Sequence, residues 1–177
     1  TGAPIAVTIR NLDHAKWKGK PIDPMTVPRP GHADLTGWLK YGLSDLRFTL
    51  ERASARETAA RVAAGGVARA FLRQLGIDCW SISAEVGGVG FDRDKATRSR
   101  EETDGSPLRC PDPEAEARMM AKVDEARSRG DTVGGIFEVT VTGLPIGLGS
   151  HVHWDRKLDG MLAQAVMSIN IVKGVEF

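Results

Sequence analysis

The sequence predicts a domain of the mixed α and β class, and three observations support this. Residues 77–86 and 135–142 each alternate apolar and polar side chains, as half-buried strands do. Residues 54–75 carry apolar side chains at helical spacing, and a second helix is expected from Pro113, with acidic residues in its first turn and Arg127 and Arg129 in its last. Strands joined by long helical connections are typical of mixed α and β proteins. A chain of 177 residues can form one core, so we expect a single core domain over 1–177.

A strand and then a loop are expected at the start of the chain. Ile5, Val7 and Ile9 alternate with Ala, Thr and Arg over residues 4–10, which is the two-residue period of a strand. Residues 11–30 contain repeated prolines and Gly19, which interrupt regular structure. Loops of this length usually carry function or contact a partner.

The strongest helix prediction covers residues 54–75. Val62, Val67 and Phe71 fall on one helical face, and Gly76 supplies a stop. Ser54 and Glu57 have the spacing of a capping box. Because alanines and glycines leave little side-chain bulk on this helix, we expect it to be buried against a sheet or another helix.

The second half of the chain continues the alternation of strands and helices. The strand over 77–86 should end at Gly87 and Gly88. Residues 91–113 are rich in charge and lack apolar periodicity, which predicts an exposed, mobile excursion. A helix then begins at Pro113, the strand over 135–142 follows, and a third helix is expected over about 156–172.

Composition excludes several function classes. Lysine plus arginine total 24 against 23 for aspartate plus glutamate, so no global field favours nucleic acid or an anionic membrane. No segment reaches the roughly 18 apolar residues of a membrane span, and the start lacks a signal-peptide pattern. Two cysteines without metal-site spacing fit a reducing cytoplasm. The absence of an initiator methionine and the abrupt end at Phe177 suggest a piece cut from something longer.

The segment Arg52-Ala53-Ser54-Ala55-Arg56-Glu57-Thr58 is the strongest local candidate for a binding site. The start of a helix offers unpaired amides and partial positive charge, and two arginines flank it. This combination suits a phosphate or a carboxylate. A capped helix whose arginines face solvent explains the same pattern.

Histidines and one asparagine give weaker signals. His32 lies in the turn Arg29-Pro30-Gly31-His32-Ala33-Asp34 and could transfer a proton near neutral pH, or could be a surface histidine. His151 and His153 could hold a metal, but no second ligand cluster supports this, and we expect no metal. Asn170 lies between two isoleucines, so we expect it to be partly buried, reading a heterocycle edge or holding a loop.

Several motifs together resemble chorismate synthase signatures in their usual order. They are Arg29-Pro30-Gly31-His32-Ala33-Asp34, Lys40-Tyr41-Gly42, the segment from Glu51 to Gly65, Met167-Ser168-Ile169-Asn170 and Val172-Lys173-Gly174-Val175-Glu176. The match covers nearly the whole chain. Family chains are considerably longer on both sides, so the resemblance implies a central core fragment, truncated at both ends and too short to be active alone.

This resemblance implies an α+β fold, the chorismate synthase β-α-β sandwich with central helices packed between antiparallel sheets, and a cytoplasmic homotetramer. The implied reaction is a 1,4-elimination of phosphate from 5-enolpyruvylshikimate-3-phosphate (EPSP) that gives chorismate for aromatic amino acid biosynthesis. It requires reduced flavin mononucleotide (FMN). The resemblance also associates the family with NADP. The reduced FMN would come from a flavin-reducing partner or from an activity of the enzyme itself.

The resemblance also assigns residues. His32 matches the catalytic histidine that protonates the reduced flavin, and Arg56 matches a substrate-binding arginine. The flavin-contacting positions are Arg52, Ala53, Ser54, Asn170 and Ile171, although the family more often has alanine where Ile171 stands. Two other functions remain open from the residues alone: a non-catalytic oligomerisation module and a phosphate-binding module.

Overall fold

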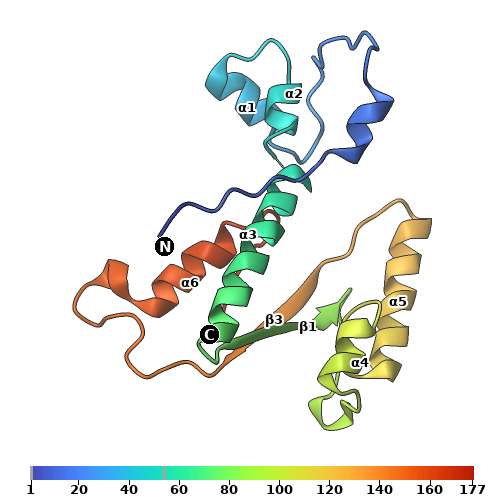
Figure 1. The fold of residues 1–177 in the computed structure, drawn as a ribbon. Helices are drawn as coiled ribbons and strands as arrows, with labels where there is room; N and C mark the ends of the chain where they lie inside the picture. Colours follow the sequence, from blue (N-terminus) through green and yellow to red (C-terminus); the bar gives the residue numbers. More distant parts are fainter. Residues whose placement is uncertain (1, 54) are drawn as a thin grey trace. The chain divides into compact units, whose positions relative to one another are not determined.

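The computed structural model describes residues 2–53 and 55–177 and divides into two compact units. Unit 1 consists of Thr1–Phe71 and Pro145–Phe177, and unit 2 of Leu72–Leu144. Helices and one antiparallel sheet make up the regular structure of the described residues (Figure 1), which confirms the predicted α+β class.

Unit 1 is helical in its described residues. Its elements are the 3-10 helices η1 (Leu12–Lys16) and η3 (Trp154–Arg156) and the α-helices α1 (Asp34–Tyr41), α2 (Arg47–Leu50), most of α3 (Ala55–Gln74) and α6 (Leu158–Met167). The third helix was predicted over about 156–172 and is shorter, because the chain turns after Met167.

The strand predicted over residues 4–10 is wrong. Residues 2–11 adopt no regular secondary structure, and Ile5, Val7 and Ile9 are all exposed. An alternating pattern becomes a strand only when a neighbouring strand takes up its backbone hydrogen bonds and a core covers its apolar face. In the described part of the chain, residues 2–11 have neither.

A small packed region holds α1 and α2 together. Leu46 is almost completely buried, and a Cβ atom on Gly37 of α1 would overlap the side chain of Thr49 in α2. The Leu46 amide donates to the Met25 carbonyl at 2.9 Å, and Asp45 accepts the Met25 amide at 3.1 Å. These bonds fix the long loop to the helix pair.

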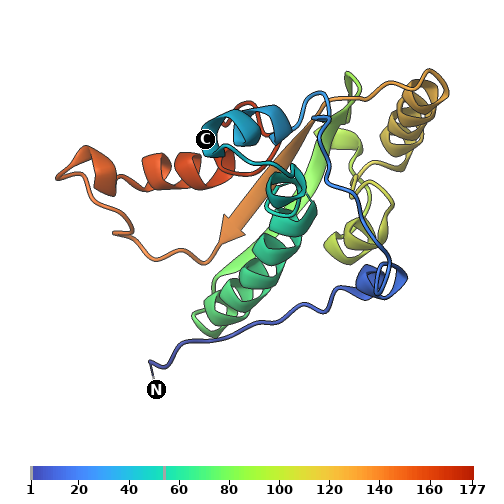
Figure 2. The same ribbon diagram turned by 90° about the horizontal axis from the view of Figure 1, so that it is seen from above.

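Unit 2 is built on a three-stranded antiparallel sheet of order β2-β1-β3. β1 (Asp78–Val86) pairs along its length with β3 (Gly135–Thr142), and β2 (Val89–Gly90) pairs only with the end of β1. Figures 1 and 2 both show β1 and β3 side by side. Gly87 and Gly88 make the β1–β2 turn with φ of 61° and 78°, values that glycine adopts without strain. The strands predicted over 77–86 and 135–142 are confirmed.

The core of unit 2 lies where α5 (Pro113–Ser128) meets the sheet. Cys110, Ala115 and Met119 are completely buried there, with Val86 and Phe91 packed against them. Pro113 occupies the first turn of α5, and Asp112 caps it by accepting the amides of residues 114 and 115. The predicted helix is confirmed.

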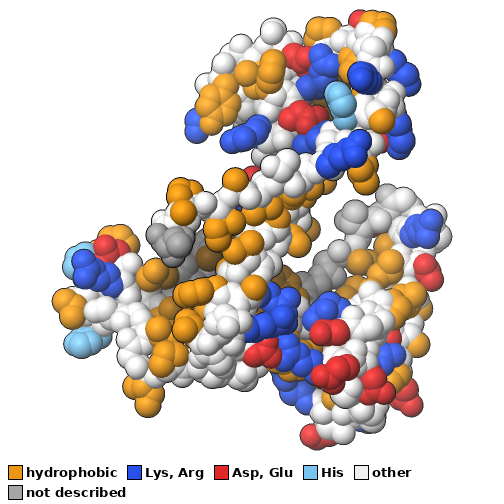
Figure 3. Space-filling model, viewed as in Figure 1, with side chains coloured by type: hydrophobic (Ala, Val, Ile, Leu, Met, Phe, Trp, Pro, Cys, Tyr) orange, Lys and Arg blue, Asp and Glu red, His pale blue; other side chains and the backbone are white. Residues whose placement is uncertain are grey.

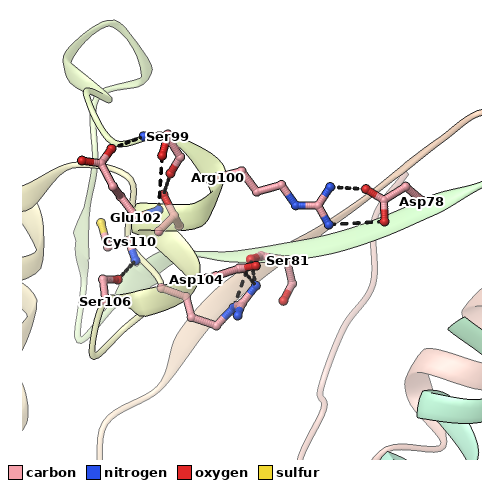
Figure 4. A network of polar contacts seen from close by, with 10 residues as sticks. Asp78, Ser81, Ser99, Arg100, Glu102, Asp104, Ser106 and Cys110 are labelled. Atoms are coloured by element: carbon pink, nitrogen blue, oxygen red, sulfur yellow. Dashed lines mark hydrogen bonds and ion pairs between the residues drawn. The ribbon is translucent and has the colours of Figure 1, made fainter. Parts of the chain in front are cut away.

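The excursion predicted over residues 91–113 is mostly exposed up to residue 107, as expected, but it is not an irregular excursion. It contains η2 (Arg93–Lys95) and α4 (Arg100–Gly105), which has a complete capping box between Ser99 and Glu102. Arginines attach it to β1: Arg100 pairs with Asp78 (Figure 4), and Arg109 donates to the Ser81 carbonyl. A segment held by charge-assisted hydrogen bonds leaves no apolar periodicity in its sequence.

The helix predicted over 54–75 is confirmed as α3, but the expected burial is not. None of its described residues is buried, and hydrophobic side chains are exposed along it (Figure 3), including Val62 and Phe71. No helix of the described residues is long and apolar enough to cross a lipid bilayer.

Candidate functional site

His32 lies in a closed turn immediately before α1. The Asp34 carboxylate is fully buried and accepts three hydrogen bonds from Arg29: the backbone amide at 3.0 Å, Nε at 2.8 Å and Nη2 at 3.0 Å. Gly31 has a φ of 70°, which lets the chain reverse inside this ring of contacts. The His32 side chain stays exposed, and its Nδ1 lies 2.9 Å from the Pro30 carbonyl oxygen.

The electrostatics of this turn keep Asp34 charged. Hydrogen bonds from Arg29 lower the pKa of the Asp34 carboxyl from 3.8 to about 2, against the opposing effect of burial. The carboxylate is therefore ionised throughout the physiological range, and the Arg29–Asp34 pair is a fixed feature of the turn.

The segment from Glu51 to Arg56 joins α2 to α3. The Arg52 amide donates to the Thr49 carbonyl at 3.1 Å, and the Ala53 amide to the Leu50 carbonyl at 3.3 Å. The Arg52 guanidinium is exposed and makes no ion pair with any residue of 2–53 or 55–177. Ser54 lies outside the described residues, so its predicted flavin contact and capping box stay predictions.

Arg56, in the first turn of α3, forms an ion pair with Glu51, and both side chains are about half exposed. Hydrogen bonds from Lys16 and Trp17 lower the pKa of Asp13, and the charge of Arg56 lowers it further, so η1 lies within electrostatic reach of α3. An arriving anion would compete with Glu51 for Arg56.

Asn170 and Ile171 follow α6 in an exposed turn. The expected partial burial of Asn170 is wrong, because its neighbours of the described chain leave it open to solvent. Ile171 is 91% exposed with a φ of 70°, a strained backbone for a β-branched residue. Arg61 Nη1 donates to Ser168 Oγ at 2.9 Å, which joins α3 to the end of α6.

Unit 1 thus brings two of the three predicted segments together. The Arg61–Ser168 bond connects the α3 helix of Arg56 with the turn of Asn170. Among the described residues, no hydrogen bond or ion pair joins His32 to either. An open cavity of ≈ 670 Å³ lies elsewhere in unit 1, lined by residues 147–151 and 157–159.

The histidines at 151 and 153 form no metal centre with the described residues. His153 Nδ1 lies 2.6 Å from Asp155 Oδ1, and no group of three or more histidine, cysteine or acidic side chains converges anywhere in 2–53 or 55–177. His151 borders the open cavity of unit 1.

Comparison with known proteins decides the family. A family model described as chorismate synthase matches residues 1–177. The chain belongs to the chorismate synthase family. It is 53% identical over 186 residues to a chorismate synthase of Carboxydothermus hydrogenoformans and 52% identical over 188 residues to one of Caldicellulosiruptor saccharolyticus. Each match covers 99% of this chain but 48% and 49% of the relative, so the chain spans about half the length of the curated relatives it matches.

A solved structure titled as a crystal structure of chorismate synthase has the same fold. It superposes with a TM-score of 0.72 at 43% sequence identity and covers 80% of this chain and 46% of that chain. The resemblance of the sequence motifs to chorismate synthase is thereby confirmed, and so is the predicted fold class.

Sequence reasoning missed two contacts that organise the chorismate synthase segments of unit 1. The Arg29–Asp34 pair closes the turn that carries His32, and the Arg61–Ser168 bond links α3 to the Asn170 turn. The first has a visible signal, since an arginine three positions before the histidine and a carboxylate two after it flank a Pro-Gly turn. The second joins residues 107 positions apart, and no local pattern announces it.

Proposed function

We propose that this chain is the core of a chorismate synthase that eliminates phosphate from EPSP, with reduced FMN as cofactor, to give chorismate. The observation that carries the proposal is the family match over all 177 residues, at about 50% identity to chorismate synthases. Because the relatives are about twice as long, we propose that this chain alone has little or no activity.

The residues of unit 1 suit a flavin and a phosphorylated acid. Arg52 offers an exposed guanidinium, and the first turn of α3 offers backbone amides and a positive dipole end. Arg52, Ala53, Ser54, Asn170 and Ile171 would hold FMN. When bound, reduced FMN supplies transient electron density to the elimination. Arg56 would leave Glu51 to bind an anionic group of the substrate.

His32 is proposed to exchange a proton during the reaction. An imidazole serves this purpose near neutral pH, and the His32 ring is exposed on a rigid turn. We propose in addition that His32 faces the same site as the Arg52 and Asn170 segments. We also propose a cytoplasmic homotetramer and a flavin-reducing partner or activity, in keeping with the family.

A chimaera tests the proposal. Residues 1–177 would replace the matching segment of the Carboxydothermus chorismate synthase, and chorismate formation from EPSP would be measured anaerobically with reduced FMN. We expect the chimaera to form chorismate and the isolated chain to form none. An inactive but folded chimaera, beside an active parent enzyme, would contradict the proposed function.

Two variants of the chimaera test the proposed roles. His32→Ala should lower kcat by about 10²–10⁴ with a smaller effect on KM, because proton transfer acts in the transition state. His151→Ala is the matched control, since that histidine is also exposed. Arg56→Ala should weaken EPSP binding; if it abolished anion binding but left turnover intact, a separate phosphate-binding module would be the better assignment.

A further inference from the structure

The turn that carries His32 is closed by contacts on both sides of the histidine. Arg29 precedes it by three residues and Asp34 follows it by two, and three hydrogen bonds of 2.8–3.0 Å join this pair. The carboxylate is completely buried, and the Arg29 side chain is 35% exposed. A buried carboxylate bound to both a backbone amide and a bidentate guanidinium has almost no freedom to move.

The Pro30 carbonyl lies within the turn that the Arg29–Asp34 pair closes. It decides which imidazole nitrogen of His32 carries a proton. His32 Nδ1 lies 2.9 Å from the Pro30 oxygen. A carbonyl oxygen can only accept a hydrogen bond, so Nδ1 must be the donor. In the neutral ring, Nε2 is then unprotonated, and in the charged ring Nε2–H is the proton not engaged by the turn.

We propose that Arg29 and Asp34 are positioning residues for His32, which fix the Pro30 carbonyl so that the imidazole is held as the Nδ1–H tautomer and exchanges its proton through Nε2. When the charged ring gives up the Nε2 proton to its reaction partner, the electron pair of that bond stays on Nε2 and the neutral Nδ1–H ring remains. The catalytic use of this proton rests on the proposed function, whereas the tautomer does not.

A purely structural role for the pair makes a different prediction. If Arg29 and Asp34 only secured the start of α1, breaking their ion pair would lower the free energy of unfolding. The ratio of the two neutral His32 forms would then stay at the value that solvent sets. If they position His32, the tautomer must respond to them. The ratio of the two neutral forms is therefore the decisive quantity, and it can be measured without flavin or substrate.

The first measurement uses the unaltered chain. With uniform ¹⁵N labelling and a two-dimensional ¹H–¹⁵N spectrum of the histidine ring at a pH where His32 is neutral, Nδ1 should show the shift of a protonated nitrogen and Nε2 that of an unprotonated one. The exposed ring of His151 serves as an internal reference for a solvent-set tautomer. A His32 ring with the proton mainly on Nε2 would overturn the proposal outright.

The second measurement uses Asp34→Asn and Arg29→Lys. Each should lower the ratio of Nδ1–H to Nε2–H forms at His32 by about threefold to tenfold, the range that corresponds to the net stability of one hydrogen bond. Asp45→Asn is the matched control. Asp45 accepts a backbone amide and pairs with Arg47 in the same unit, so its loss should leave the His32 ratio unchanged.

Two outcomes of the variant experiment would reject the positioning role. One is an unchanged His32 ratio in a folded Asp34→Asn chain, and the other is an equal change in Asp45→Asn. If burial of the amide prevents Asp34→Asn from folding, Arg29→Lys decides alone, because it keeps the charge and removes only the bidentate fork. An inactive chimaera would reject the proposed function while leaving this tautomer assignment standing.

Discussion

Gly31 shows how one residue can set the geometry of the His32 turn. Its φ of 70° lies in the left-handed region, and nothing lies within 4 Å of where a Cβ would be. Any penalty for a larger side chain therefore comes from the backbone itself. The left-handed backbone of Gly31 therefore sets the bend of the turn, and the Arg29–Asp34 ion pair joins the two ends of the turn.

Gly31→Ala should lower the free energy of unfolding by about 1 kcal/mol, because a left-handed backbone strains every residue with a Cβ. Gly66→Ala is the matched control: Gly66 lies inside α3, is equally uncrowded and has no positive φ. This second change should stabilise the chain by up to about 1 kcal/mol, since alanine favours helix more than glycine does. Urea unfolding of both variants measures the difference, and equal effects of the same sign would contradict the assignment.

Asp34 gives the chain an acid-sensitive contact. Its folded pKa of about 2 lies below the ordinary value of 3.8, so the stabilisation is fully present above pH 3.8 and disappears as pH falls toward 2. Asp34→Asn should therefore be less stable than the unaltered chain at pH 7, and the gap should shrink between about pH 4 and pH 2. Unfolding midpoints across this range measure it. A gap that is constant with pH would show that the ionised carboxylate contributes nothing.

At the scale of elements, the sequence predicted α3, β1 and β3, because their apolar residues recur at the period of a helix or a strand, and α5 from Pro113 and the charges of its first and last turns. The predictions were wrong where a segment has the periodic pattern without tertiary contacts to support it, or the contacts without the pattern. Residues 4–10 have the strand pattern but no partner strand, and α4 has support without the pattern, through Arg100 and Arg109. Within the candidate site, the turn of His32 was visible in the sequence. The exposure of Asn170 was not, because it depends on which distant segment covers it.

Ser99→Ala tests whether α4 depends on its capping box. Ser99 Oγ accepts the Glu102 amide at 3.2 Å, and Glu102 accepts the Ser99 amide at 2.7 Å. Loss of the hydroxyl should lower local stability by about 1 kcal/mol. Faster hydrogen exchange of the α4 amides would report the change. Ser128→Ala is the control at the exposed end of α5, where the hydroxyl only donates to the Glu125 carbonyl, and it should leave α4 exchange unaltered.

At the scale of the whole molecule, burial is divided unequally between the two units. The buried hydrophobic residues of the described chain are Leu46, Ile77, Ile82, Cys110, Ala115 and Met119, and only Leu46 lies in unit 1. Many large apolar side chains of unit 1 are exposed instead, Val62, Phe71 and Ile171 among them. Since burial of apolar surface supplies most of the stability of a domain, unit 2 has the better-stabilised fold.

The two units should consequently lose structure at different denaturant concentrations. Amides of β1, β3 and α5 should be the most protected from hydrogen exchange, and those of α6 and the α1–α2 region should exchange through a lower-energy opening. Met119→Ala, which empties a completely buried site in unit 2, should cost about 2–5 kcal/mol there and lower the protection of β1 while α1 keeps its own. Hydrogen exchange followed by mass spectrometry across a urea series resolves the two units. Coincident transitions for both, with Met119→Ala shifting α1 and β1 equally, would mean that the chain unfolds as one cooperative body and that the division of burial has no energetic consequence.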